Sequence, residues 1–110
     1  MIIHIDARRL TSAAALHAAL SEAFGFPDTY GKNLDALVDC LTYLDDPDAA
    51  MSRVQIFPGQ TALLVLDHYD EATGKSQKAQ LASLLDAIAF VNWRRLEQQE
   101  PPVLAVAYTD

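Results

Sequence analysis

The chain has 110 residues, of which 51% are hydrophobic and 21% are charged, and its formal net charge is −7. This length and composition predict a single folded domain, residues 1–110, and exclude a disordered or collagen-like chain. The acidic balance argues against direct binding to nucleic acid and favours a basic protein partner. With one cysteine, no secretory signal pattern and no apolar run long enough to span a bilayer, the sequence predicts a cytoplasmic protein without membrane contact.

The first half of the chain predicts one strand and two helices. Residues 1–6 carry branched apolar side chains and predict a buried strand. A helix follows with Thr11 or Ser12 as its N-cap, and Gly25 suits the left-handed position after its last turn. Residues 33–44 predict a second, short helix. The apolar face of this second helix is predicted to comprise Leu34, Leu37, Val38 and Leu41.

The second half predicts two more strands on either side of the longest helix. After a loop at 45–48, residues 49–60 fit either a short helix or an irregular segment. Residues 61–66 predict a strand, residues 76–99 a helix, and residues 103–108 a third strand. Parallel strands need helical crossovers, and strands without polar–apolar alternation are typical of sheets buried on both faces. The sequence therefore predicts an α/β fold, a small layer in which helices pack on a three-stranded parallel sheet.

Negative charge is concentrated between residues 28 and 48, which contain six aspartates and one lysine. Asp35 and Asp39 are four residues apart, so they share one face of the predicted second helix. Like charges at this spacing destabilise a helix by a few tenths of a kcal/mol, roughly. Two interpretations remain open: a solvated helix face, or a binding site for a cationic groove or an arginine cluster.

The residues from Tyr30 to Leu41 read YGKNLDALVDCL and closely resemble the signature of the barstar family of intracellular ribonuclease inhibitors. The resemblance covers most of the chain at the level of its pattern, and it implies the barstar-like fold. It also implies a non-enzymatic function, in which this helix and the loop before it block a ribonuclease active site. The aspartate matching Asp39 would occupy the position of a substrate phosphate. The other partner-binding positions implied by the resemblance are Tyr30, Gly31, Asn33, Leu34 and Asp35.

The chain also departs from the family pattern. Thr29, Lys32, Val38 and Leu44 stand where the family has a tyrosine, an acid, a tryptophan and another aromatic residue. The chain is longer than the family's usual length around residues 45–60, and the glutamate of the family's last helix has no evident counterpart. Two functions are therefore considered: an inhibitor or immunity protein against a ribonuclease of the barnase type or another nuclease, and a binding or regulatory module for a non-nuclease basic partner.

A third hypothesis is a small hydrolase. Asp67, His68 and Asp70 follow the second predicted strand, where open α/β sheets bind ligands, and either aspartate could orient His68 as a base. Neighbours in sequence seldom point to one centre, so ordinary loop polarity is the simpler explanation. Cys40 lies beside Asp39, which disfavours a reactive thiolate and favours a buried structural thiol. We expect no catalytic residue, no cofactor and no metal.

Overall fold

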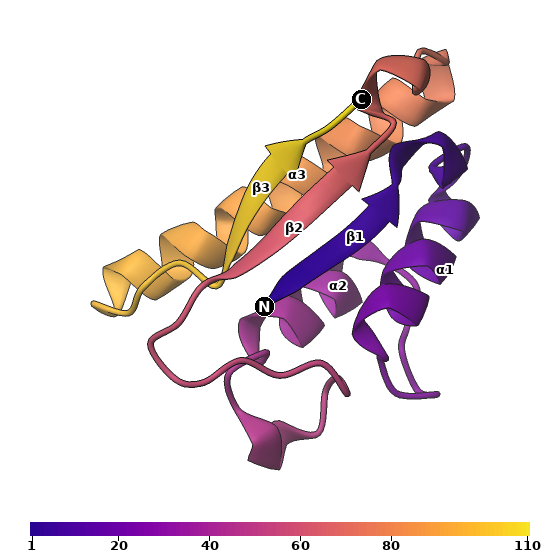
Figure 1. The fold of residues 1–110 in the computed structure, drawn as a ribbon. Coiled ribbons are helices and arrows are strands. Elements are labelled where there is room, and N and C mark those ends of the chain that lie inside the picture. Colours follow the sequence, from indigo (N-terminus) through magenta and orange to yellow (C-terminus); the bar gives the residue numbers. More distant parts are fainter.

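A computed structural model describes residues 1–110, and its strands form one parallel sheet in the order β1-β2-β3. The strands are β1 (Ile2–Asp6), β2 (Ala62–Asp67) and β3 (Leu104–Tyr108). The predicted α/β fold with a three-stranded parallel sheet is confirmed. Figure 1 shows the helices behind this sheet, with its other face left open.

Three α-helices connect the strands: α1 (Ala13–Phe24), α2 (Leu34–Thr42) and α3 (Lys75–Glu97). Short 3-10 turns occur at Ala7–Arg9, Pro47–Ala49 and Tyr69–Glu71. None of the helices is long and apolar enough to cross a membrane.

Caps set the ends of α1. The side chain of Ser12 accepts a hydrogen bond from the backbone N–H of Ala15, so Ser12, not Thr11, is the N-cap. At the other end Gly25 takes a left-handed conformation with φ +69°, and a Cβ there would lie 2.6 Å from Nε of Arg53. Only glycine fits this turn without displacing Arg53.

The core fills the space between the helices and one face of the sheet. On that face, Ile3 and Ile5 of β1 lie beside Leu64 and Leu66 of β2, and all four are buried. Against them pack the apolar stripe of α1 and the inward sides of α2 and α3. The buried residues of these helices include Leu16, Leu20, Phe24, Leu37, Leu41, Leu81, Leu84, Ile88 and Val91.

The expectation of a sheet buried on both faces is wrong for the edge strands. Burial alternates along β1, where Ile2 is 60% exposed and His4 is exposed, and Ala105 of β3 is exposed as well. Only the central strand β2 is largely buried, with Val65 flanked in register by His4 and Ala107. Small and amphipathic side chains on the edge strands allow the outer face to meet water, so alternation in β3 is weak in sequence although one face is open.

Of the two possibilities that the sequence left open for residues 49–60, the structure shows the irregular segment, and a 3-10 turn lies mainly in the predicted loop before it. A 3-10 turn at Pro47–Ala49 is followed by irregular chain. Backbone hydrogen bonds hold this chain in place: the N–H of Arg53 donates to the carbonyl of Phe24, and that of Ile56 to the carbonyl of Leu44. The segment therefore packs against the ends of both α1 and α2.

Candidate functional site between α2 and α3

The start of α2 is fixed by Asn33. Its side-chain oxygen accepts a hydrogen bond of 2.8 Å from the backbone N–H of Ala36, and its amide donates to the carbonyl of Gly31 at 3.3 Å. A Cβ on Gly31 would lie 3.3 Å from both Ala36 Cβ and the Asn33 amide, so a side chain there would crowd the cap. The loop and the first turn of α2 thus form one closely packed unit, with Asp35 in the first turn where the helix dipole favours a carboxylate.

Tyr30 supports this unit from below. Its side chain is 8% exposed, its ring packs 4.8 Å from that of Phe26, and its hydroxyl is joined to Nδ1 of His17 by a hydrogen bond of 2.6 Å. Burial lowers the pKa of His17 and raises that of Tyr30, so both side chains are neutral near pH 7. Tyr30 therefore shapes the loop from the core and does not present its ring to the surface.

A groove of about 500 Å³ runs between α2 and α3. It is lined from α2 by Leu34, Asp35, Val38 and Asp39, and from α3 chiefly by Asp86, Phe90 and Arg94. Asp35 and Asp39 share this groove, as their spacing predicts, and each is exposed without an ion pair. Asp86 adds a third carboxylate that the sequence did not single out, because it lies 47 positions beyond Asp39 and meets α2 only in the fold.

Arg94 is the one cation that lines this groove. Its guanidinium carbon lies 5.5 Å from the centre of the Phe90 ring, a cation–π arrangement, and it forms no ion pair. The carboxylates of Asp35 and Asp39 therefore keep their full capacity to accept hydrogen bonds from another molecule.

The predicted apolar face of α2 is partly wrong. Leu37 and Leu41 are buried, but Leu34 is 43% exposed and Val38 is half-buried. The inward row instead continues through Cys40 to Leu44, which is completely buried. Both rows obey helical spacing, so the sequence pattern alone could not choose between them. The row that faces outward gives the groove an apolar wall beside its carboxylates.

Cys40 is a buried structural thiol, as predicted. Its side chain is 2% exposed, and burial together with the charge of Asp39 raises the pKa of the thiol. The thiolate is disfavoured, so this cysteine contributes packing and no nucleophile.

Arg95 is a residue whose role the sequence did not indicate. Arg95 is 4% exposed and pairs with both carboxylate oxygens of Asp45 at 2.7 and 3.2 Å. Its Nε also donates to the carbonyl of Pro101 at 2.8 Å. Asp45 is therefore neutralised within the fold, and the acidity available at the surface comes from the other aspartates of residues 28–48.

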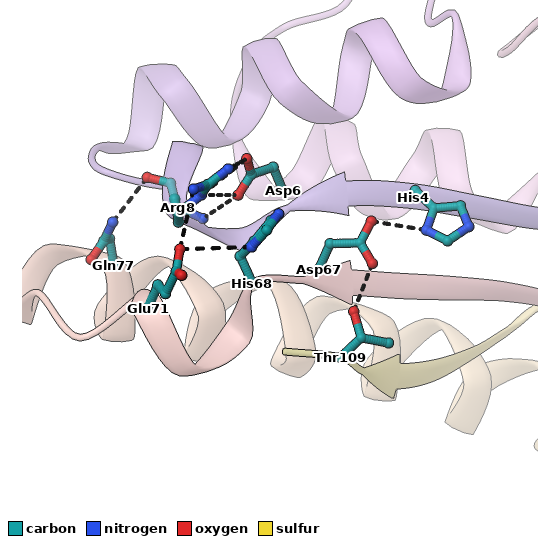
Figure 2. A network of polar contacts seen from close by, with 8 residues as sticks. All are labelled: His4, Asp6, Arg8, Asp67, His68, Glu71, Gln77 and Thr109. Carbon is teal, nitrogen blue, oxygen red and sulfur yellow. Dashed lines mark hydrogen bonds and ion pairs between the residues drawn. The ribbon is translucent and has the colours of Figure 1, made fainter.

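The carboxyl edge of the sheet, considered above as a hydrolase site, holds a network of hydrogen bonds and ion pairs between its own side chains (Figure 2). Asp67 accepts a hydrogen bond from Thr109 at 2.7 Å and contacts His4 at 2.9 Å. His68 approaches Glu71 at 3.6 Å and pairs with neither Asp67 nor Asp70, so the proposed orientation of His68 by these residues is wrong. The described residues contain no group of three His, Cys, Asp or Glu side chains that could hold a metal ion.

At the same edge Arg8 links two carboxylates. It donates to both oxygens of Asp6, with the shortest distance 2.8 Å, and to Glu71 at 3.1 Å. The hydrogen bonds from Arg8 lower the pKa of Asp6 to about 2. These contacts join the end of β1 to the turn after β2, which is a structural function.

The fold and the groove define a class of small α/β proteins with three parallel strands, helices on one face and an acidic helix surface. The sequence pattern of the Barstar (barnase inhibitor) family matches residues 1–107, and the chain belongs to this family. Its relatives include the protein named "Putative ribonuclease inhibitor YrdF" of Bacillus subtilis (strain 168), which is 52% identical over 40 residues. This match covers 36% of the chain and 44% of the relative, less than half of the relative's length.

Proposed function

We propose that this protein is a cytoplasmic inhibitor, or immunity protein, that blocks the active site of a basic ribonuclease of the barnase type with α2 and the loop before it. The observation that carries the proposal is the pair of exposed, unpaired carboxylates of Asp35 and Asp39 on a capped helix, within the segment that resembles the family signature. Membership of a family described as barnase inhibitors supports a ribonuclease as the partner.

Asp39 is the anchor of the proposed interface. A carboxylate accepts charge-assisted hydrogen bonds from arginine and protonated histidine, as a phosphate oxygen pair does. Residues that bind the phosphate of RNA would therefore bind Asp39 in the same way, and substrate would be excluded. Because α2 is capped and packed, the helix backbone that carries Asp39 is held in position before binding, which limits the entropy lost on association.

The neighbouring residues supply the rest of the interface. Asp35 and Asp86 add negative charge on either side of the groove, and the exposed Leu34 adds apolar contact area. Gly31 and Asn33 give the loop its close approach to the partner, while Tyr30 holds that loop from the core. The net charge of −7 accelerates the encounter with a basic enzyme.

Calorimetric titration against a microbial guanyl-specific ribonuclease tests this function. We expect one-to-one binding that weakens as salt is raised. Asp39→Asn keeps the size of the side chain and removes its charge, and should weaken binding by about 100-fold, which is the range of an interface hot spot. Asp48→Asn is the matched control, because Asp48 is exposed in the same acidic stretch but does not line the groove, and it should change binding less than about threefold.

Two results would contradict the proposal. Absence of binding would favour the other function considered above, a binding module for a non-nuclease basic partner. Equal effects of Asp39→Asn and Asp48→Asn would mean that the ribonuclease responds only to overall negative charge. Inhibition of RNA cleavage, measured with the same variants, should follow the same order as the affinities.

A further inference from the structure

The outer side of α3 carries a strip of large apolar side chains exposed to solvent. Phe90 is 47% exposed, Trp93 is 57% exposed and Leu96 is 58% exposed. They are spaced three residues apart, so they follow one another along the helix surface, and the rings of Phe90 and Trp93 are 6.1 Å apart. We call these three residues the α3 strip. Single exposed apolar residues are common, but a strip of neighbouring large apolar side chains is typical of an interaction surface.

The α3 strip is continuous with the acidic groove. Phe90 belongs to both, because it lines the groove opposite Leu34 and Val38 of α2. Arg94 lies over the Phe90 ring and holds it at the border between the two. The ring of Phe90 thus adds to the apolar wall that Leu34 and Val38 form beside the carboxylates of Asp35 and Asp39.

We propose that the α3 strip is the second half of the docking surface, and that the ribonuclease bound by Asp35 and Asp39 also covers Phe90 and Trp93. This inference rests on the proposed function and extends it to α3. Apolar groups around a charged pair exclude water, and hydrogen bonds to a carboxylate are stronger where water is excluded. Tryptophan and arginine are also the residues most often found among interface hot spots.

Charge determines which molecule fits this surface. Two copies of the chain, each with a net charge of −7, would repel one another, and an anionic membrane would repel the chain as well. A cationic enzyme cleft with an apolar rim matches both parts: its cations meet the groove, and its rim meets the α3 strip.

Trp93 is the only tryptophan of the chain, so it can report on the surface directly. The protein is produced with 5-fluorotryptophan and its single fluorine resonance is recorded with and without the unlabelled guanyl-specific ribonuclease. We expect the resonance to shift on binding. We also expect the difference in its frequency between H2O and D2O to decrease, because the indole loses contact with solvent in the complex.

Titration of substitution variants measures how much the α3 strip contributes. Trp93→Ala and Phe90→Ala should each weaken binding by about tenfold or more. Ile2→Ala is the control, because Ile2 is an equally exposed apolar residue, 60% exposed, on the open face of the sheet away from the helices, and it should leave the affinity unchanged. Thermal unfolding of each variant confirms that all remain folded.

The outcomes separate this inference from the proposed function. If Asp39→Asn weakens binding while Trp93→Ala and Phe90→Ala bind like the wild type and the fluorine resonance keeps its solvent dependence, the interface ends at the groove and the inference is overturned alone. If the ribonuclease does not bind the wild-type protein at all, the inhibitor function and the inference are both overturned.

Discussion

His17 and Tyr30 are buried together below the loop that precedes α2 and share a hydrogen bond of 2.6 Å, and the burial of His17 is expected to make that loop sensitive to acid. In the unfolded chain a histidine binds a proton near its ordinary pKa of 6.5, whereas burial lowers the pKa of His17 in the folded protein. Below pH 6.5 the unfolded state therefore holds more protons than the folded state. The stability that neutral His17 provides is complete above pH 6.5 and is lost as the pH falls toward its folded pKa.

We accordingly expect the free energy of unfolding to fall between about pH 7.5 and about pH 5, and we expect His17→Gln to reduce that fall. Urea unfolding of the wild type and the variant at both pH values gives the comparison. The carboxylates titrate alike in the two proteins, so the difference between their slopes isolates His17. Identical slopes would contradict the assignment of this pH dependence to His17.

At the residue scale, the sequence predicted which carboxylates share a surface better than it predicted which aromatic and apolar side chains are buried. Asp35 and Asp39 line one groove because a spacing of four residues fixes them on the same side of a helix. The depth of Tyr30 could not be predicted in this way, because its burial depends on Phe26 and His17, which contact it only after the chain has turned. Leu34 was misassigned to the core for a related reason: two apolar rows compete on α2, and only the position of the sheet selects one.

Among the elements, α2 depends most on its cap. It is the shortest of the three α-helices, with nine residues, and helices of this length are marginal without packing and capping. Asn33→Ala removes the acceptor for the N–H of Ala36 and should reduce the free energy of unfolding by about 1 kcal/mol. Asn33→Asp keeps that acceptor and should stay close to the wild type. Chemical denaturation distinguishes them. An equal loss of stability in both variants would show that the hydrogen bond from the Asn33 side-chain amide to the carbonyl of Gly31, not the cap, stabilises the helix.

The helices and strands themselves were largely predictable, because most rest on local patterns. The stripe of α1 follows from residues four apart, and the ends of α3, at Lys75 and Glu97, lie within two residues of the predicted range. Residues 49–60 were not predictable, since backbone hydrogen bonds to the carbonyls of Phe24 and Leu44 hold them, and no side-chain pattern encodes such bonds. The open face of the sheet was missed because alanine is compatible with both buried and exposed positions, so the alanines of β3 do not show which face is exposed.

For the whole molecule, the pair of Arg95 and Asp45 joins the end of α3 to the segment after α2. Arg95 of α3 binds Asp45 after α2 and the carbonyl of Pro101 before β3, with side-chain exposures of 5% and 14% for the two charged partners. Removing one partner of such a pair leaves a buried charge, so Arg95→Met should reduce the free energy of unfolding by about 3 kcal/mol. Arg94→Met, a neighbour without an ion pair, should change it by less than about 1 kcal/mol.

A double variant tests whether the loss comes from the unpaired charge. Arg95→Met combined with Asp45→Leu replaces the pair by apolar side chains, and should be more stable than Arg95→Met alone. Denaturant unfolding of Arg95→Met, Asp45→Leu and the double variant completes the comparison. A double variant less stable than either single variant would mean that the two side chains stabilise the fold independently.

The arrangement of the sheet also bears on when the protein becomes active during its synthesis. The β1 strand is made early but pairs with β2, and β2 pairs with β3, so the sheet is complete only after β3 has been made. A ribosome adds about 5–20 residues per second, and α2 emerges well before α3, which forms the other wall of the groove. A nascent chain therefore carries the acidic helix without a complete surface to bind with. Under the proposed function, a cell would be protected from the ribonuclease only by molecules in which α3 and β3 have already been made and folded.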